Sequence, residues 1–217
     1  CTKLTELNLS SCESLENVNG LAKCTNLTKL DLSYCDSLQN VRGLAKCTKL
    51  NNLNLDCCYE IRNVDGLDNC TNLTNLNLSS CGRLQNVDGL KNCTNLTNLD
   101  LSSCNSLQNL NGVAGLVNLT NLNLYRCKSL RPIPAPETMT TRAEVETYQL
   151  KVMKKAGMEI PESFGIAISS GNRKKKSIRD TIKTSIDRKT LSKIKKFLKS
   201  RDYNHIDSGI ELIRSMD

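Results

Sequence analysis

Hydrophobic and polar positions recur along this chain with a period of 23 residues. The first copy places Leu4, Leu7 and Leu9 ahead of Cys12, and the same frame returns five more times. The six copies begin at Cys1, Cys24, Cys47, Cys70, Cys93 and Leu116. A unit this short cannot bury its own hydrophobic face, so neighbouring copies must stack into a solenoid with a shared core.

Each copy is predicted to contain one strand and one return segment. Leu7 and Leu9 alternate with polar residues, which indicates a short strand with one buried face. The apolar residues that follow, Leu15, Val18 and Leu21, predict an irregular or 3₁₀ return along the other side of the coil. A glycine near the end of the copy is expected where the backbone needs conformational freedom, at Gly20, Gly43, Gly66, Gly89 and Gly112.

The pattern L-x-x-L-x-L-x-x-N/C, met from Leu4 to Cys12 and in every later copy, is similar to that of the leucine-rich repeat family. The resemblance covers residues 1–134. It implies an α/β fold, a right-handed solenoid whose parallel strands line a concave face that binds other proteins. The three-residue step from Cys12 to Leu15 looks closer to plant resistance-type and some bacterial repeats.

Eleven of the twelve cysteines occupy two offsets of the repeat, and Cys57 is the exception. Such thiols are expected to pack as small apolar core residues. Adjacent coils lie ~5 Å apart, which would permit disulfides, but equivalent Cβ vectors run parallel and do not converge. Reduced thiols favour a cytoplasmic or otherwise reducing compartment. Cys57 is interpreted as an exposed, incidental thiol whose alkylation should leave binding intact.

Two further ladders have structural interpretations. In the family's terms, the Cys12 side chain satisfies backbone groups of a turn. The series that starts at Asn17 is interpreted as a turn-stabilising ladder. Zinc binding is disfavoured, because His205 is the one histidine and thiols at one offset form a line instead of a tetrahedron. No metal, cofactor or catalytic residue is expected, since the sequence shows no phosphate-cradling glycine loop, paired-carboxylate motif or Cys–His arrangement.

Binding residues are expected where the copies differ, because packing fixes the core offsets. Tyrosine and arginine are common hot-spot residues at interfaces. The predicted partner-binding residues are Glu6, Lys29, Asp31, Tyr34, Asp56, Tyr59, Asp100, Tyr125 and Arg126. The alternative is that these scattered residues face solvent and have no binding role.

The 23-residue rhythm stops near Pro134, and residues 135–160 are predicted to form a capping segment. Thr141 and Glu144 have capping-box spacing, and Gly157 is placed to end a helix that begins near Thr141. The apolar stripe of that helix could close the open end of the solenoid, as terminal caps do in repeat arrays.

Residues 161–176 are predicted to be a linker and residues 177–217 a basic α-helical unit, truncated at Asp217. Up to Pro134 the chain carries 12 basic and 11 acidic residues, whereas the remainder carries 18 and 11, which accounts for the net charge of +8. Most of this charge lies between Arg173 and Arg201, and its simplest interpretation is a solvated helix face without a binding role. Because the chain begins inside a repeat at Cys1, we expect it to be a fragment.

The leading functional prediction is a non-enzymatic module, a scaffold for protein–protein interaction, that binds a protein partner on the concave face. One alternative gives the basic tail a nucleic acid or an anionic membrane surface. Another makes the repeats the targeting arm of a larger enzyme. No apolar run reaches the length of a transmembrane helix.

Overall fold

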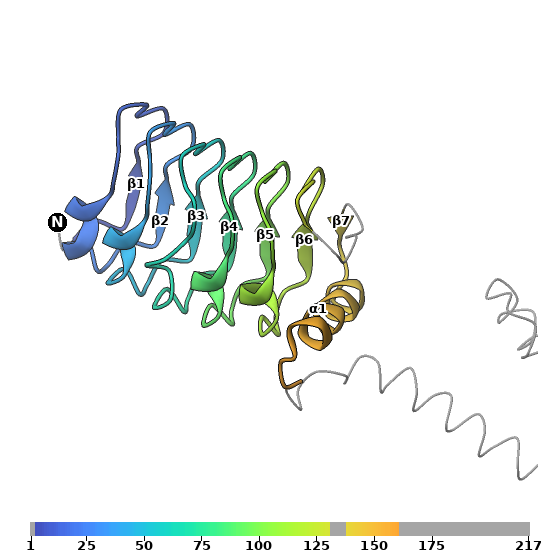
Figure 1. The fold of residues 1–217 in the computed structure, drawn as a ribbon. Helices are drawn as coiled ribbons and strands as arrows, with labels where there is room; N and C mark the ends of the chain where they lie inside the picture. The colour runs from blue at the N-terminus through green and yellow to red at the C-terminus, as the bar shows by residue number, and fades with distance from the viewer. Residues whose placement is uncertain (1–2, 131–137, 161–217) are drawn as a thin grey trace, which may run out of the picture. The chain divides into compact units, whose positions relative to one another are not determined.

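The computed structural model describes residues 3–130 and 138–160. The repeats form successive coils, each with one three-residue strand, and these strands pair in parallel, in chain order and in register (Figure 1). The predicted solenoid is therefore confirmed. The strands are β1 Glu6–Asn8, β2 Lys29–Asp31, β3 Asn52–Asn54, β4 Asn75–Asn77, β5 Asn98–Asp100 and β6 Asn121–Asn123.

The core is a stack of leucine and cysteine layers. The middle residue of each strand from β2 to β6 points inward and is at most 3% exposed, as Leu30 and Leu76 illustrate. In the first coil, Leu4, Leu7 and Leu9 pack against this core while remaining partly exposed. The period-two alternation thus divides each strand into a buried leucine and two outward polar side chains.

Short 3₁₀ helices form the return in four of the coils, as predicted: η1 Asn19–Lys23, η2 Arg42–Leu44, η3 Asp88–Leu90 and η4 Asn111–Val113. The glycines within the returns mostly serve a different purpose from the one predicted. A Cβ on Gly43, Gly89 or Gly112 would overlap a valine carbonyl of the preceding coil, so close approach of backbones requires glycine there. Only Gly66 among the repeat glycines has a positive φ, of 105°.

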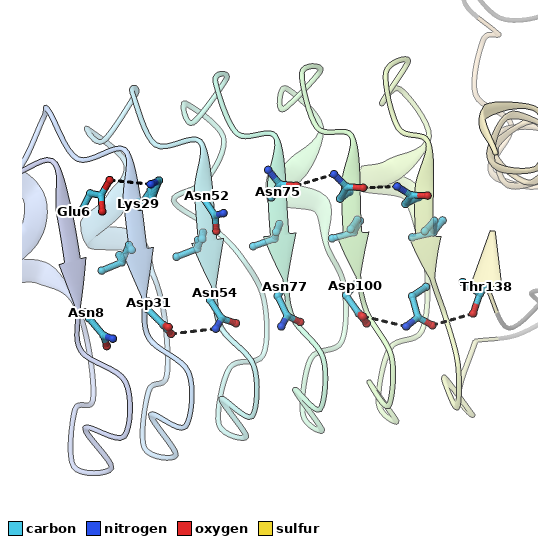
Figure 2. A pocket seen from close by; sticks show the side chains of 18 of the residues that line it. Glu6, Asn8, Lys29, Asp31, Asn52, Asn54, Asn75, Asn77, Asp100 and Thr138 are labelled. Atoms are coloured by element: carbon cyan, nitrogen blue, oxygen red, sulfur yellow. Dashed lines mark hydrogen bonds and ion pairs between the residues drawn. The ribbon is translucent and has the colours of Figure 1, made fainter. Parts of the chain in front are cut away.

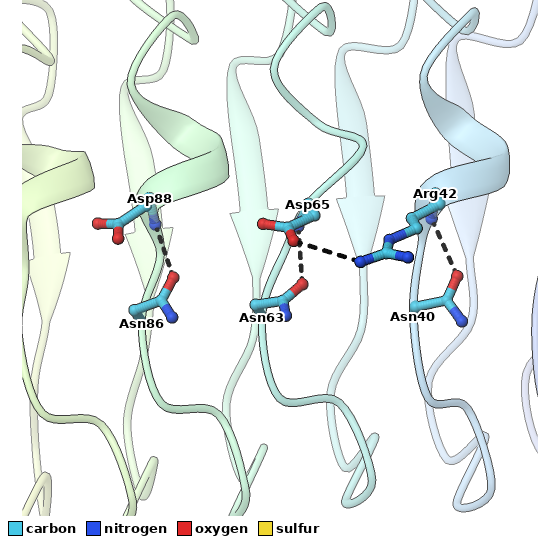
Figure 3. Close-up of polar contacts among 6 residues, drawn as sticks. All are labelled: Asn40, Arg42, Asn63, Asp65, Asn86 and Asp88. Carbon is cyan, nitrogen blue, oxygen red and sulfur yellow. Dashed lines mark hydrogen bonds and ion pairs between the residues drawn. The ribbon is translucent and has the colours of Figure 1, made fainter.

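The asparagine ladder beside the returns stabilises turns, as predicted (Figure 3). The backbone N–H of Arg42 donates to Oδ1 of Asn40 at 3.3 Å, and Asn17, Asn63, Asn86 and Asn109 each accept the same bond from the residue two positions later. An ion pair of 3.7 Å between Arg42 and Asp65 links two neighbouring returns.

The cysteines form two ladders of hydrogen bonds between coils. The Cys58 thiol donates to the Leu32 carbonyl at 3.1 Å, and its equivalents from Cys35 to Cys127 do the same across 26 residues. The second ladder joins Cys47, Cys70 and Cys93 to the carbonyls of Leu21, Leu44 and Leu67, again across 26 residues. All eleven described cysteines are free, so the prediction of unpaired thiols is confirmed for them.

Two elements close the C-terminal end of the solenoid. Strand β7 (Thr138–Met139) pairs antiparallel with β6, and helix α1 (Arg142–Ala156) follows it. The expected helix is present with its capping box, in which Glu144 N–H donates to Thr141 Oγ1 and Thr141 N–H donates to Glu144 Oε2. Gly157 ends the helix in the left-handed conformation, with φ of 64°. The sequence did not predict β7, because two residues carry no measurable alternation.

Helix α1 substitutes for a further coil by hydrogen bonding the last return. Gln149 is 1% exposed, and its Nε2 donates to the carbonyls of Val113 at 2.7 Å and Leu116 at 3.1 Å. In earlier coils, the thiol of a cysteine 26 residues later donates to the carbonyl equivalent to that of Val113. The predicted linker 161–176 and basic unit 177–217 lie outside the described residues, so the domain division remains a prediction.

Candidate functional site

The outward face of the sheet forms a continuous groove of about 920 Å³. It runs past all six parallel strands and ends at Thr138, Met139 and Thr140. Figure 2 shows two rows of polar side chains along it, one on each side of the buried leucines. The first row holds Glu6, Lys29, Asn52, Asn75, Asn98 and Asn121, and the second holds Asn8, Asp31, Asn54, Asn77, Asp100 and Asn123.

The first row is linked across strands by its own side chains. Glu6 and Lys29 form an ion pair of 2.9 Å with both side chains more than half exposed. Further along, Asn98 Nδ2 donates to Asn75 Oδ1 at 2.7 Å, and Asn121 donates in turn to Asn98. Parallel in-register pairing produces this ladder, because it places the identical amides of β4, β5 and β6 next to one another.

The second row supports the turns that follow the strands. Oδ1 of each residue accepts the backbone N–H two residues along, as Asp31 does from Ser33 at 2.9 Å and Asp100 from Ser102 at 2.8 Å. Asp31 also accepts from the Ser33 hydroxyl at 2.7 Å and from Asn54 Nδ2 at 3.1 Å. The side-chain oxygen at this offset therefore has a structural role that Asn and Asp both satisfy.

The predicted partner-binding residues separate into three groups. Glu6, Lys29, Asp31 and Asp100 line the groove. The other five lie in the turns that follow the strands and do not line the groove. The second group is Tyr125 and Arg126 in the last coil, where the Arg126 guanidinium lies 5.0 Å from the centre of the Tyr125 ring. The third group is Tyr34, Asp56 and Tyr59, in the turns of the second and third coils.

This third group is organised around Cys57, which is partly exposed. A hydrogen bond with the Cys57 side chain raises the pKa of Tyr59 to about 12. Charge interactions with Cys57 and then Asp56 also raise the pKa of Tyr34. The Cys57 thiol itself donates to Asp56 Oδ1 at 3.5 Å. Cys57 thus contributes to the raised pKa of both tyrosines.

Sequence reasoning missed the asparagine amides of the first row. Asn52, Asn75, Asn98 and Asn121 are small and uniform, and the search for binding residues favoured positions where copies differ. One pattern could have identified them: the same polar residue type recurs at an outward strand position where, unlike in the second row, its side chain is not needed to stabilise a turn. These amides give the groove its main hydrogen-bonding surface.

The buried thiols are not suited to chemistry. Burial raises the pKa of Cys58, Cys70 and Cys93 to about 12, and that of Cys127 to about 11. A thiolate is the form that attacks substrates or binds metals, so these side chains are inert at neutral pH. Within residues 3–130 and 138–160, no group of three or more His, Cys, Asp and Glu residues could hold a metal ion.

No family model and no curated protein matches this chain. Among solved structures, internalin C2 of Listeria monocytogenes is 25% identical over 56% of this chain and 62% of its own, with a TM-score of 0.36. The functional domain of InlJ from Listeria monocytogenes, which includes a cysteine ladder, is 18% identical over 61% and 34%, with a TM-score of 0.36. The leucine-rich repeat domain of the type III effector XopL is 18% identical over 61% and 64%, with a TM-score of 0.39. The chain spans less than two thirds of the length of each of these structures.

The chain's own geometry decides the fold, because every copy of the motif from Leu4 to Cys12 places its strand in register with the next. This chain is a leucine-rich repeat solenoid. In the part of the chain that the structure describes, no helix is long and apolar enough to cross a membrane.

Proposed function

We propose that this leucine-rich repeat solenoid is a non-enzymatic protein-binding module whose partner lies in the groove of the sheet. The observation that carries the proposal is the continuous groove of about 920 Å³, lined on both sides by polar side chains from all six parallel strands. In this groove a rigid scaffold presents many hydrogen-bond donors and acceptors at fixed spacing, which suits a protein interface.

The dimensions favour an extended polypeptide segment as the bound element. Neighbouring strands lie ~4.8 Å apart, so six strands span roughly 24 Å, the length of about seven extended residues. An asparagine amide carries both donors and an acceptor, and the groups that the ladder does not use suit the alternating N–H and C=O groups of a peptide backbone. Asn52 is exposed, and its side chain makes none of the bonds between coils found in the described residues, so its amide is available to a partner.

The ionisable groups of the groove support binding over catalysis. Glu6 is ion-paired with Lys29, and Asp31 accepts three hydrogen bonds from its own turn and from the next strand. Asp100 is bonded in the same way to Ser102 and Asn123. These carboxylates maintain the turns and the register of the sheet, and they do not converge on one reacting centre.

The test is protein capture by the immobilised full chain, with bound proteins identified by mass spectrometry and their affinities then measured in purified form. A variant with Asn75, Asn98 and Asn121 changed to alanine should lose the partner. The matched control changes Gln39, Gln85 and Gln108 to alanine; these glutamines are exposed and follow the turns, away from the groove. A second variant, Asn52→Arg, should obstruct the groove with a longer side chain and removes no hydrogen bond between coils. Undiminished affinity in both groove variants would refute the proposal.

A further inference from the structure

A pair of exposed tyrosines marks a second surface, separate from the groove. In the other copies, the positions of Tyr34 and Cys57 hold Ser11, Ser80, Ser103 or Arg126, and the position of Tyr59 holds acidic, small or basic residues. These three departures from the repeat lie in adjacent turns, because the Tyr34 N–H donates to the carbonyl of Asp56, next to Cys57, and Tyr59 follows Cys57 by two residues. Packing of the core does not require them, since Tyr34 is 51% exposed and Tyr59 is 45% exposed.

The backbone fixes where this surface points. Tyr34 and Cys57 both lie in the left-handed region, with φ of 58° and 59°, and the N–H of each donates to a carbonyl of the next coil. These bonds, Tyr34 N–H to Asp56 at 2.8 Å and Cys57 N–H to Ser79 at 2.9 Å, hold the two turns side by side. The tyrosine rings are thus presented from a rigid edge of the solenoid.

The surroundings of the rings are acidic. Asp36 and Asp56 both interact electrostatically with Tyr59, and Asp36 is exposed. The neighbouring Glu60 is already paired with Arg83 of the next coil. Aromatic faces beside carboxylates attract a cation by both the ring quadrupole and charge. The chemistry therefore fits a lysine or arginine side chain.

The last coil provides an internal example of the same arrangement. There the Tyr125 ring is covered by the guanidinium of Arg126, 5.0 Å from the ring centre. This is the one cation–ring contact among the described residues, and it leaves Tyr34 and Tyr59 without such a cation. Arg126 occupies the repeat position that Tyr34 and Cys57 occupy in earlier coils.

We propose that Tyr34 and Tyr59, with Asp36 and Asp56 beside them, bind a lysine or arginine side chain of a partner protein. The proposal does not depend on the groove, and a partner could engage either surface alone. The net charge of +8 on the chain opposes non-specific attraction of a cationic probe, so saturable binding must come from a local site.

The test is a titration of the full chain against a fluorescent Gly-Arg-Gly-Arg-Gly peptide, followed by anisotropy at low ionic strength. The double variant Tyr34→Ser, Tyr59→Asn uses the residues found at the same offsets in Ser80 and Asn105, so it should fold. We expect its affinity to be at least about fivefold weaker, from the loss of two exposed cation–ring contacts. The peptide with citrulline in place of arginine should bind wild-type protein about as weakly.

Matched controls separate this surface from the groove. Tyr125→Ser removes an exposed tyrosine elsewhere and should leave the affinity unchanged. Failure of the groove proposal alone would show in protein capture, whereas the dependence of peptide binding on arginine and on the two tyrosines reports on this surface. Absence of saturable binding to wild type, equal binding by the tyrosine variant, or equal binding of the citrulline peptide would each overturn the inference.

Discussion

Substitution of Gln149 by leucine tests whether helix α1 replaces a missing coil. The change keeps a buried side chain of similar size but removes the two hydrogen bonds that Nε2 donates to Val113 and Leu116. Gln149 Oε1 also accepts from Arg142 at 2.7 Å, and Arg142 keeps a second bond to the Leu119 carbonyl. The substitution therefore removes three bonds in total at a site that is 1% exposed.

The magnitude follows from what each partner retains. The Val113 and Leu116 carbonyls still accept backbone N–H groups, from Leu116 at 3.2 Å and Leu119 at 3.1 Å, so neither is left without a bond. A net loss of about 0.5–1.5 kcal/mol per hydrogen bond then applies, without the full penalty of an unsatisfied buried group. We expect the free energy of unfolding to fall by about 2–4 kcal/mol.

The assay is urea unfolding followed by circular dichroism, with hydrogen exchange to locate the effect. Exchange should accelerate in α1 and β6 before it does in β2 and β3, because stability in a repeat array is transmitted between neighbours. Gln108→Leu changes an exposed glutamine on the last complete coils and should stay within about 0.5 kcal/mol of wild type. Equal unfolding curves for the two variants would refute the capping role of Gln149.

Two other predictions concern the core. Burial raises the pKa of Cys58, Cys70 and Cys93 to about 12 from 9.0, so the folded chain keeps protons that the unfolded chain loses. The contribution of each thiol to the free energy of unfolding should be complete below about pH 9 and should fall by about 1.4 kcal/mol per pH unit up to about pH 12. A urea midpoint that is unchanged between pH 7.5 and 10.5 would contradict this. Gly112→Ala should destabilise by about 1–3 kcal/mol or more, since its Cβ would overlap the Val87 carbonyl. Gly115→Ala, with nothing within 4 Å of its Cβ, is the thermal-melting control, and equal melting temperatures would reject the close-approach explanation.

The repeat made most of the fold predictable. Six near-identical copies fix where each leucine lies, and the period-two alternation around Leu30 or Leu53 determines which face is buried. The helix after Thr141 was equally predictable, because its capping box and terminal glycine are local signals. Strand β7 was not, since two residues gain strand structure only from the exposed edge of β6.

The site was less predictable than the fold. Asp31 and Asp100 differ from the asparagines of other copies in charge but share their turn-forming bond, so their part in partner binding stays a prediction. Conversely, Asn75, Asn98 and Asn121 form the ladder in the groove because register brings them together, which no single copy reveals. The meeting of Tyr34 and Tyr59 at Cys57 also depends on contacts between coils that only the structure shows.

Site-specific photo-crosslinking would test the central claim most directly. A benzophenone amino acid would be placed at Asn8, inside the groove, or at Gln85, on the exposed surface after the turn. The account predicts that the captured partner cross-links to position 8 and not to position 85, and that an excess of wild-type chain, which lacks the benzophenone, abolishes the product. Cross-linking from position 85 alone would contradict the account, because it would place the partner outside the groove.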